Sequence, residues 1–406
     1  MGKPTIRFEG YTDDWEQRKL GDIYGLIGNA FVGTATPYYA EQGHFYLESN
    51  NVKDGQINHN SEVFINDEFY EKQKDKWLHT GDMVMVQSGH VGHAAVIPEE
   101  LDNTAAHALI MFRNPKEEIE PYFLNYEYQT DKAKKKIENI TTGNTIKHIL
   151  SSDMQEFVVD VPKYEEQKVI AGYFSNIDNL ITLHQRKCEE TKKIKKFMLQ
   201  KMFPKKGEKV PEIRFDGFTD DWEQRKLPEF VSFFNGLTYT PDDVEETGTL
   251  VLRSSNVKNG EIVDADNVYV NDKVATSENV QEGDIIIVVR NGSRALIGKH
   301  AQIKASMPNT VIGAFMSGMR SEHSSFVNAL LDTSAFENEI AKNMGATINQ
   351  ITGYMFSKME FMIPSEEEQQ QIGEYFQSLD HLITLHQHKC KELQNIKKFM
   401  LQNMFI

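Results

Sequence analysis

The sequence predicts an α+β protein built as two tandem copies of one module, each a strand-rich body followed by a long helix. Two internal repeats carry this prediction. Thr5–Leu20 returns as Glu212–Leu227 with 13 of 16 positions identical, and Leu180–Phe203 returns as Leu382–Phe405 with 18 of 24 identical. A period of about 200 residues is that of whole domains rather than of a solenoid. Such a duplication suggests a partner or ligand with approximate two-fold symmetry.

The repeats and the composition between them divide the chain into five segments. We expect a first body, a first long helix, a linker, a second body and a second long helix. The linker contains two prolines, a glycine and four charged residues, which is typical of a boundary between domains. The segments span residues 1–161, 162–203, 204–211, 212–363 and 364–406.

Each copy opens with the motif Asp-Asp-Trp-Glu-Gln-Arg-Lys-Leu. We interpret this motif as a short strand, a turn and the start of a helix. Asp13 and Asp220 stand where they would cap that helix, and a glutamate three residues later completes a capping-box pattern. The neighbouring Trp15 and Trp222 are expected to be packing anchors.

Each body contains a compact apolar run that predicts a buried strand. Met83–Val86 and Ile285–Val289 are both preceded by Gly-Asp. Upstream, the polar stretch 49–55 matches 254–260, and both close on a glycine, which predicts a turn. Between these landmarks the two bodies diverge in sequence. The two copies therefore share their repeated end segments and differ in the residues between them.

The long helices are predicted by their first turn and by an apolar seam. Pro162 and Pro364 are followed by glutamates, which suit the N-terminal end of a helix dipole. Spacings of four and three then continue for about three heptads, which predicts that the two helices pair with each other as a coiled coil and act as a rigid spacer. We interpret the seam histidines as polar positions that set register and the cysteines as packing positions in a reducing compartment. The seam residues are Ile170, Phe174, Ile177, Ile181, His184, Cys188 and Thr191, and then Ile372, Phe376, Leu379, Ile383, His386, Cys390 and Leu393.

The composition constrains the class of protein. The chain has no apolar run of 18 residues and its first residues lack the apolar segment of a secretory signal, so we expect a cytoplasmic protein with no membrane segment. The formal net charge of −16 argues against nucleic-acid binding. However, residues 162–209 carry 12 basic and 6 acidic residues, and local basic loops can hold DNA when a partner contributes phosphate contacts.

The motifs that would identify an enzyme are missing. The sequence contains no phosphate-binding G-x-x-x-x-G-K-[ST], no dinucleotide-binding G-x-G-x-x-G after a strand and no amino-methyltransferase Asn/Asp-Pro-Pro-aromatic motif. It also lacks H-E-x-x-H, G-x-S-x-G and Cys-x-x-Cys. We therefore expect a chain that binds or reads rather than catalyses, with no catalytic residue, no metal site and no cofactor of its own.

The duplicated frame and the Pro-x-x-Glu-Glu-Gln helix opening resemble the specificity subunit (HsdS) of type I restriction–modification enzymes. The resemblance covers essentially the whole chain. Two further motifs contribute to it in both copies. A Gly-x-Thr segment (residues 143–149 and 345–351) precedes the strand that leads into the helix, and a Gly-Asp strand is followed by a Gly-containing loop (residues 81–92 and 283–298).

The resemblance implies two target-recognition domains held apart by antiparallel spacer helices. Each domain would read one half of an asymmetric, bipartite site on double-stranded DNA. Two methyltransferase subunits docked on the helices would supply S-adenosylmethionine and adenine N6 methylation, and motor–nuclease subunits would supply ATP and Mg²⁺ chemistry. The resemblance therefore implies that this chain determines which DNA sequence the complex recognises.

The residues expected to contact bases are those whose side chains suit base edges: Arg or Lys for guanine, Asn or Gln for adenine, and Ser or Thr for either. In the first body these are Asn50, Asn51, Lys53, Gln87, Ser88, His90, Thr142, Asn144 and Lys147. In the second body they are Arg253, Ser255, Asn256, Lys258, Arg290, Asn291, Ser293, Arg294, Thr347 and Asn349. Two alternatives remain open: a scaffold protein that binds no DNA and assembles partners through its coiled coil, which the acidic charge favours, and a self-contained enzyme, which the missing motifs disfavour.

Overall fold

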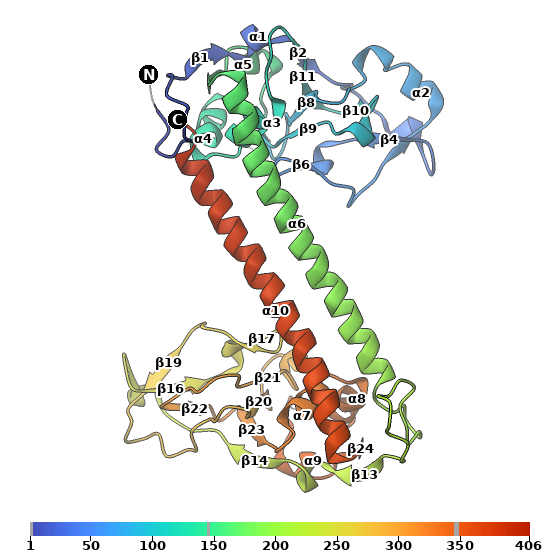
Figure 1. Cartoon of the computed structure of the whole chain (residues 1–406), viewed down its shortest axis with the longest axis vertical. Helices are drawn as coiled ribbons and strands as arrows, with labels where there is room; N and C mark the ends of the chain where they lie inside the picture. The colour runs from blue at the N-terminus through green and yellow to red at the C-terminus, as the bar shows by residue number, and fades with distance from the viewer. Residues whose placement is uncertain (1–2, 144–146, 345–348) are drawn as a thin grey trace. The chain divides into compact units, whose positions relative to one another are not determined.

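The computed structural model describes residues 3–143, 147–344 and 349–406, and the chain forms two compact units (Figure 1). Unit 1 contains Met1–His184 and His388–Ile406, and unit 2 contains Gln185–Gln387. Each unit therefore includes the last part of a long helix that belongs, in sequence, to the other repeat. The compact units do not follow the linear division into a body and the helix after it.

Unit 1 is built around two four-stranded sheets. The first has the strand order β2-β11-β8-β9 and is antiparallel throughout, and the second has the order β10-β4-β7-β3. Figure 1 shows the second sheet, with α2, farther from α6 than the first. The strands are β2 (Tyr24–Asn29), β11 (Leu109–Pro115), β8 (Met83–Val86), β9 (Ala94–Val96), β10 (Ala105–Ala106), β4 (His44–Leu47), β7 (Phe64–Ile65) and β3 (Tyr39–Ala40), beside a hairpin of β5 (Val52–Lys53) and β6 (Gln56–Ile57).

Unit 2 repeats this arrangement. Its sheets have the orders β14-β23-β20-β21 and β15-β19-β16-β22. The strands are β14 (Ser232–Asn235), β23 (Met316–Arg320), β20 (Ile285–Val288), β21 (His300–Gln302), β15 (Val244–Glu245), β19 (Val268–Val270), β16 (Thr249–Leu252) and β22 (Thr310–Ile312), beside a hairpin of β17 (Val257–Lys258) and β18 (Glu261–Ile262).

The apolar runs that predicted buried strands form the centre of the first sheet in each unit. In β8, Met83 and Met85 belong to one core cluster while Val84 and Val86 belong to another. Because successive side chains of a strand point to opposite faces, a strand covered on both faces is apolar at every position. The prediction of buried strands is confirmed, with β20 ending one residue earlier than expected.

The opening motif contains the predicted short strand, but no helix starts where Asp13 or Asp220 would cap it. The next helical turn begins only at the last residue of the motif, Leu20 or Leu227. Glu16–Lys19 (β1) pairs antiparallel with β12 (Val158–Val161), and β13 (Glu223–Lys226) pairs in the same way with β24 (Glu360–Ile363). The capping role predicted for Asp13 and Asp220 is therefore wrong. Pairing with a distant strand outweighs a local capping pattern that no apolar periodicity supports.

The two tryptophans of this motif are packing anchors, as predicted. Trp15 and Trp222 are each 2% exposed. Trp15 packs edge-to-face on Phe123 and Phe405, and Trp222 packs in the same way on Phe203.

The long helices are α6 (Tyr164–Lys201) and α10 (Glu366–Asn403). The Glu-Glu-Gln of each opening has a role beyond the helix dipole. Glu166 is buried and forms two 2.7 Å hydrogen bonds with Arg7. The side-chain amide of Gln167 donates to the Pro162 carbonyl at 2.9 Å, which closes the first turn. Unit 2 repeats both contacts with Arg214, Glu368, Gln369 and Pro364.

Parts of both long helices run antiparallel to each other within each unit. In unit 1, the Cys390 thiol lies 3.6 Å from the Ile181 carbonyl and Lys397 pairs with Asp178 at 2.7 Å. Phe405, beyond the end of α10, reaches Phe174 near the start of α6. Unit 2 contains the same contacts between Cys188 and Ile383, Lys195 and Asp380, and Phe203 and Phe376. The repeated end of each helix thus completes the core of the opposite repeat's body.

The shorter helices other than α2 contribute to the core clusters between the first sheet and the long helices, whereas Phe69 of α2 packs in the core of the second sheet. The seam histidines His184 and His386 are half-buried. The helices of unit 1 are α1 (Leu20–Ile23), α2 (Asp67–Glu71), α3 (Pro121–Glu127), α4 (Asp131–Ile140) and α5 (Ser151–Gln155). Those of unit 2 are α7 (Ser324–Leu331), α8 (Ser334–Asn343) and α9 (Gly353–Phe356).

Candidate nucleic-acid interface

Three polar segments meet at the end of strand β8 in unit 1. The segment after β8 forms an isolated bridge between Ser88 and His148, and Thr142 forms another with the same histidine. The Gly89 amide donates to the Lys147 carbonyl at 3.1 Å. The His90 imidazole lies 3.0 Å from the Ser49 carbonyl, which ties this loop to the turn at residues 49–51. Segments separated by up to 99 residues are thus brought to one edge of the sheet.

Unit 2 brings together the matching segments at the end of β20. Arg290 forms an isolated bridge with Gln350, and the Asn349 side chain donates to the Gly292 carbonyl at 3.0 Å. The Asn291 side chain donates to the Ser254 hydroxyl at 3.1 Å, which joins the loop to the turn at residues 254–256. The same construction therefore presents a different set of side chains in each unit.

The loop after β20 is longer than its counterpart in unit 1. Nine residues separate Val288 from Gly298, whereas five separate Val86 from Gly92. The two glycines are equivalent, because each amide donates back to the last residue of its strand and each has a positive φ near 90°. The extra residues in unit 2 form a short 3₁₀ turn at Arg294–Leu296.

Most of the predicted contact residues lie on this polar edge with exposed or half-exposed side chains. Asn144 and Thr347 lie outside the described residues. The exposed or half-exposed residues are Asn50, Lys53, Gln87, Ser88, His90, Thr142 and Lys147 in unit 1, and Arg253, Ser255, Lys258, Arg290, Asn291, Ser293, Arg294 and Asn349 in unit 2.

Asn51 and Asn256 have a different environment from the other predicted residues, because both are almost completely buried. The side-chain oxygen Oδ1 of Asn51 accepts from the Glu48 backbone amide at 3.0 Å, and its side-chain Nδ2 donates to the backbone carbonyls of Asn58 and Ser61. Asn256 makes the equivalent bonds in unit 2. Both side chains hold the loop that follows them, so we leave them out of the proposed DNA contacts.

The arginines of unit 2 differ in their partners. Arg253 is half-exposed and paired with Asp266 at 2.7 Å. The exposed guanidinium of Arg290 instead lies over the ring of Phe315, 5.1 Å from its centre. Phe315 is 56% exposed. The sequence did not identify Phe315 as part of the site, because it lies within the apolar run Val-Ile-Gly-Ala-Phe-Met, which reads as core.

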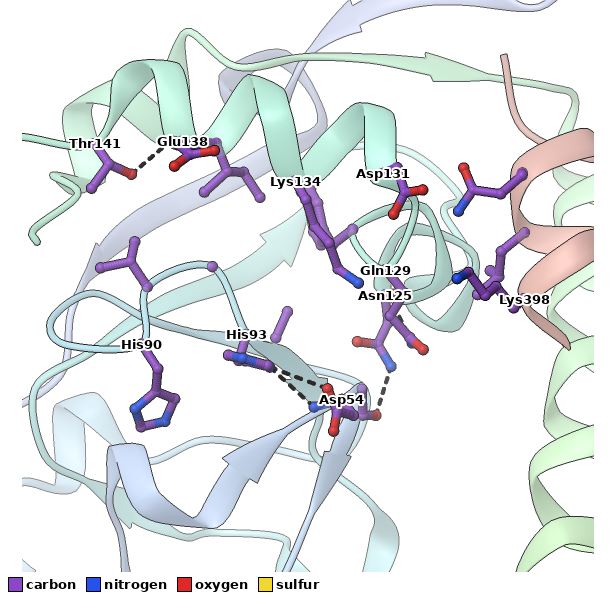
Figure 2. Close-up of a pocket in the computed structure, with 18 of the residues that line it drawn as sticks. Asp54, His90, His93, Asn125, Gln129, Asp131, Lys134, Glu138, Thr141 and Lys398 are labelled. Atoms are coloured by element: carbon purple, nitrogen blue, oxygen red, sulfur yellow. Dashed lines mark hydrogen bonds and ion pairs between the residues drawn. The ribbon is translucent and has the colours of Figure 1, made fainter. Parts of the chain in front are cut away.

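A pocket of about 680 Å³ lies beside the polar edge of unit 1 (Figure 2). Its wall includes Gly89 and His90 of the loop and Lys147. Figure 2 shows Lys134 extending from α4 toward it, with Lys398 of α10 on another side. The pocket is mixed in charge, since acidic and basic side chains both line it.

Two polar contacts fix the floor of this pocket. The Asp54 amide donates to His93 Nδ1 at 3.2 Å, and burial lowers the pKa of His93, which favours the neutral ring that accepts this bond. The Asn125 side chain donates to the Gly55 carbonyl at 2.8 Å. Both contacts hold the hairpin turn at residues 54–55 against the sheet.

A buried carboxyl near α4 distinguishes unit 1 from unit 2. Burial raises the pKa of Glu127 to about 8, and one of its oxygens has no hydrogen-bond partner among the described residues. Nearby, Asp160 lies within 4 Å of both Lys132 and Lys136. At the equivalent place, α7 carries the apolar Leu330.

No helix in the described parts of the chain is long and apolar enough to cross a membrane. Over the same residues, no group of three His, Cys, Asp or Glu side chains is arranged to hold a metal ion.

Comparison with known proteins matches most of the chain to one family. Residues 12–193 and 219–395 each match the type I restriction modification DNA specificity domain. The chain is 23% identical over 409 residues to the type I restriction enzyme MjaVIII specificity subunit of Methanocaldococcus jannaschii, covering 95% of this chain and 91% of that protein. It is 26% identical over 169 residues to the EcoKI specificity subunit of Escherichia coli (strain K12), covering 39% of this chain and 36% of that protein.

A solved structure shares the fold. The S subunit of a type I restriction–modification system from M. genitalium superimposes with a TM-score of 0.69 at 14% identity, covering 100% of this chain and 99% of that one. Two matched domains, arranged in tandem over most of the sequence, agree with the duplicated polar edges described above. The chain therefore belongs to the family of type I restriction–modification DNA specificity subunits.

Proposed function

We propose that each unit reads one half of an asymmetric, bipartite DNA site through the polar edge at the end of β8 or β20. The observation that carries this proposal is the shared construction with different side chains. Both edges are assembled from a strand end, a 3₁₀ turn and the segment before α5 or α9. Because base identity is read by side-chain donors and acceptors, different side chains on equivalent edges read different bases.

The formal net charge of the chain is −16, but the local distribution of its basic side chains is compatible with DNA binding. Many of its basic side chains are paired with carboxylates, as Arg7 is with Glu166. On the polar edges, Lys53, Lys258 and the arginines of the β20 loop are exposed. Specific base contacts need only a few such groups, while partner subunits contribute phosphate contacts that raise affinity.

We further propose that the paired helices dock two methyltransferase subunits, which carry S-adenosylmethionine and methylate adenine at N6. In unit 1, Leu180 and Leu183 of α6 and Ile396 and Phe399 of α10 are between 40% and 58% exposed. Leu180 and Leu183 each stand one position before a seam residue. Ile396 and Phe399 each stand one position before the places, 397 and 400, that continue the seam spacing of four and three past Leu393. They therefore lie along the same flank of each helix, and in an antiparallel pair the same flanks share one face.

Unit 2 has the same apolar face, formed by Ile194 and Phe197 of α6 and Leu382 and Leu385 of α10. Contiguous exposed apolar residues on a paired-helix surface are typical of a protein interface. Two equivalent faces fit two copies of one partner. Motor–nuclease subunits would supply the ATP and Mg²⁺ chemistry.

The test is the exchange of one body. Residues 28–140 are replaced by the corresponding body of another specificity subunit, and the chain is co-expressed with its methyltransferase subunit. Mapping of N6-methyladenine should show a new half-site on one side of the motif and the original half-site on the other. A chain that acted only as a protein scaffold would form the same complex and leave the pattern of methylation unrelated to the exchanged body.

A further inference from the structure

The arginines of the two units differ in whether a carboxylate holds them. Unit 1 contains three arginines, and each is within 4 Å of a carboxylate: Arg7 with Glu166, Arg18 with Glu117, and Arg113 with Asp82. Unit 2 contains seven, of which five have such a partner: Arg186, Arg214, Arg225, Arg253 and Arg320. Within the described part of the chain, the two arginines without one are Arg290 and Arg294, both on the loop after β20.

Of these two arginines, Arg290 is the one whose side chain packs on an aromatic ring in the described part of the chain. Its backbone amide donates to the Phe315 carbonyl at 3.2 Å, and its side chain lies over the ring of the same residue. A guanidinium over an aromatic face is attracted by the ring's negative face, while its N–H donors, which lie in the guanidinium plane, remain available. Phe315 thus restricts the direction of Arg290 without using its hydrogen-bonding capacity.

The strand registers show which residues of unit 1 occupy the places of this pair. Leu109 pairs with Val86 as Met316 pairs with Val288, so Ala108 corresponds to Phe315 and Ser88 corresponds to Arg290. Ser88 also bridges to His148 as Arg290 bridges to Gln350. Both members of the pair are therefore replaced together in unit 1.

We propose that Arg290, positioned by Phe315, reads a guanine in the half-site of unit 2, and that unit 1 has no equivalent guanine contact. Arginine binds the O6 and N7 atoms of guanine with two parallel hydrogen bonds, and such a pair discriminates against other bases by about five- to 150-fold. The proposal rests on the proposed function, because it assigns one base contact to the polar edge of unit 2.

The test uses the full complex of this chain with its methyltransferase subunit. The motif methylated by the wild-type complex is compared with those of Arg290→Gln, Arg290→Lys and Phe315→Ala, with Arg225→Gln as a control arginine away from the polar edge. We expect Arg290→Gln to relax or change the preference at one guanine in the half-site of unit 2, by about five- to 150-fold. Arg290→Lys should lose part of this preference, because a single ammonium lacks the two-pronged geometry.

Phe315 is tested as a positioning residue. Phe315→Ala should weaken discrimination at the same base and at no other, and Phe315→Tyr should restore it, since a phenol ring keeps the aromatic face. Complex formation and thermal unfolding of every variant are measured in parallel, so that a folding defect is recognised. If the Arg290→Gln variant does not assemble with the methyltransferase subunit, the Phe315→Ala and Arg290→Lys variants test the guanine assignment.

The outcomes distinguish a failure of the guanine assignment from a failure of the proposed function on which it rests. A wild-type complex that methylates no specific motif would contradict the proposed function. A wild-type complex with a bipartite motif that all the assembled Arg290 and Phe315 variants leave unchanged would overturn the guanine assignment alone. The same holds if the half-site assigned to unit 2 by body exchange contains no invariant G·C pair.

Discussion

Individual residues in this chain show how the same loop construction presents two different polar edges. Asn51 and Asn256 are the same residue in the same environment, and their buried amides hold equivalent turns. Neighbouring exposed positions, such as Ser88 and Arg290, differ in chemistry between the units. The buried polar residues maintain the loop geometry, so the exposed residues are able to change without loss of the fold.

Replacement of Asn256 by alanine tests this division of roles. The Asn256→Ala variant leaves the Arg253 amide and the Ala265 carbonyl without partners, so we expect it to lower stability by roughly 2–4 kcal/mol. The control Ser255→Ala, at an exposed position of the same turn, should be nearly neutral. Calorimetric unfolding of both variants is the measurement, and equal stabilities would show that the buried amide does not hold the turn.

Glu127 supports a prediction about pH. Its folded-state pKa of about 8 lies above its ordinary value of 4.5, so folding takes up a proton between these values and stability falls as pH rises through this window. Glu127→Leu, which copies Leu330 of unit 2, removes this dependence. Between pH 6 and pH 8 we expect the variant's stability relative to wild type to improve by roughly 2 kcal/mol.

The comparison for Glu127 is the exposed Glu118→Gln, which should follow the wild-type pH profile. Thermal unfolding recorded at pH 5, 6, 7 and 8 provides the data. A difference between Glu127→Leu and wild type that stayed constant from pH 5 to pH 8 would contradict the assignment of a raised pKa.

Among the elements, the long helices were the most predictable and the short strands the least. α6 and α10 are 38 residues each and begin and end within a few residues of the expected ranges, because an apolar seam sustained for about three heptads is a strong signal. The two-residue strands β3, β7 and β10 show no alternation that a sequence reveals. They exist because tertiary packing of Tyr46 and Phe69 holds them in place.

The same contrast explains why the opening motif was misread. Four residues with a capping pattern satisfy a local rule, but the pairing of β1 with β12 depends on residues 139 to 145 positions away. For the candidate site, the strand ends and glycine turns were visible in the sequence. Phe315 was not, because exposure of one apolar residue in an apolar run depends on where the strand begins.

The apolar helix face leads to a prediction at the scale of the element. Phe197→Ser with Phe399→Ser removes one large exposed apolar residue from the face in each unit, and both side chains are at least half exposed. We expect normal folding of the chain and at least a tenfold loss of affinity for the methyltransferase subunit, because aromatic anchors carry much of the binding energy of an interface.

The control for the helix face replaces Arg186 and Lys391, exposed residues of the same helices outside the apolar face, with serine. Sedimentation or calorimetric titration with the purified methyltransferase subunit measures binding. Unchanged affinity in the Phe197 and Phe399 double variant would show that the methyltransferase docks elsewhere.

At the scale of the whole molecule, the exchange of helix ends between repeats is the main structural result. Phe405 completes the core around Trp15, and Phe203 completes the core around Trp222. The near-identity of these helix ends in sequence follows from this role, since both must fit equivalent cores. Each body therefore depends on the other repeat's helix, and the two are expected to fold as parts of one chain.

The most direct measurement of the central claim is a map of N6-methyladenine in DNA from cells that co-express this chain with its methyltransferase subunit. The account predicts a single motif made of two different half-sites separated by a fixed, unspecified spacer, because two equivalent edges carry different side chains. A continuous or palindromic motif, or no new methylation despite a stable complex, would contradict it.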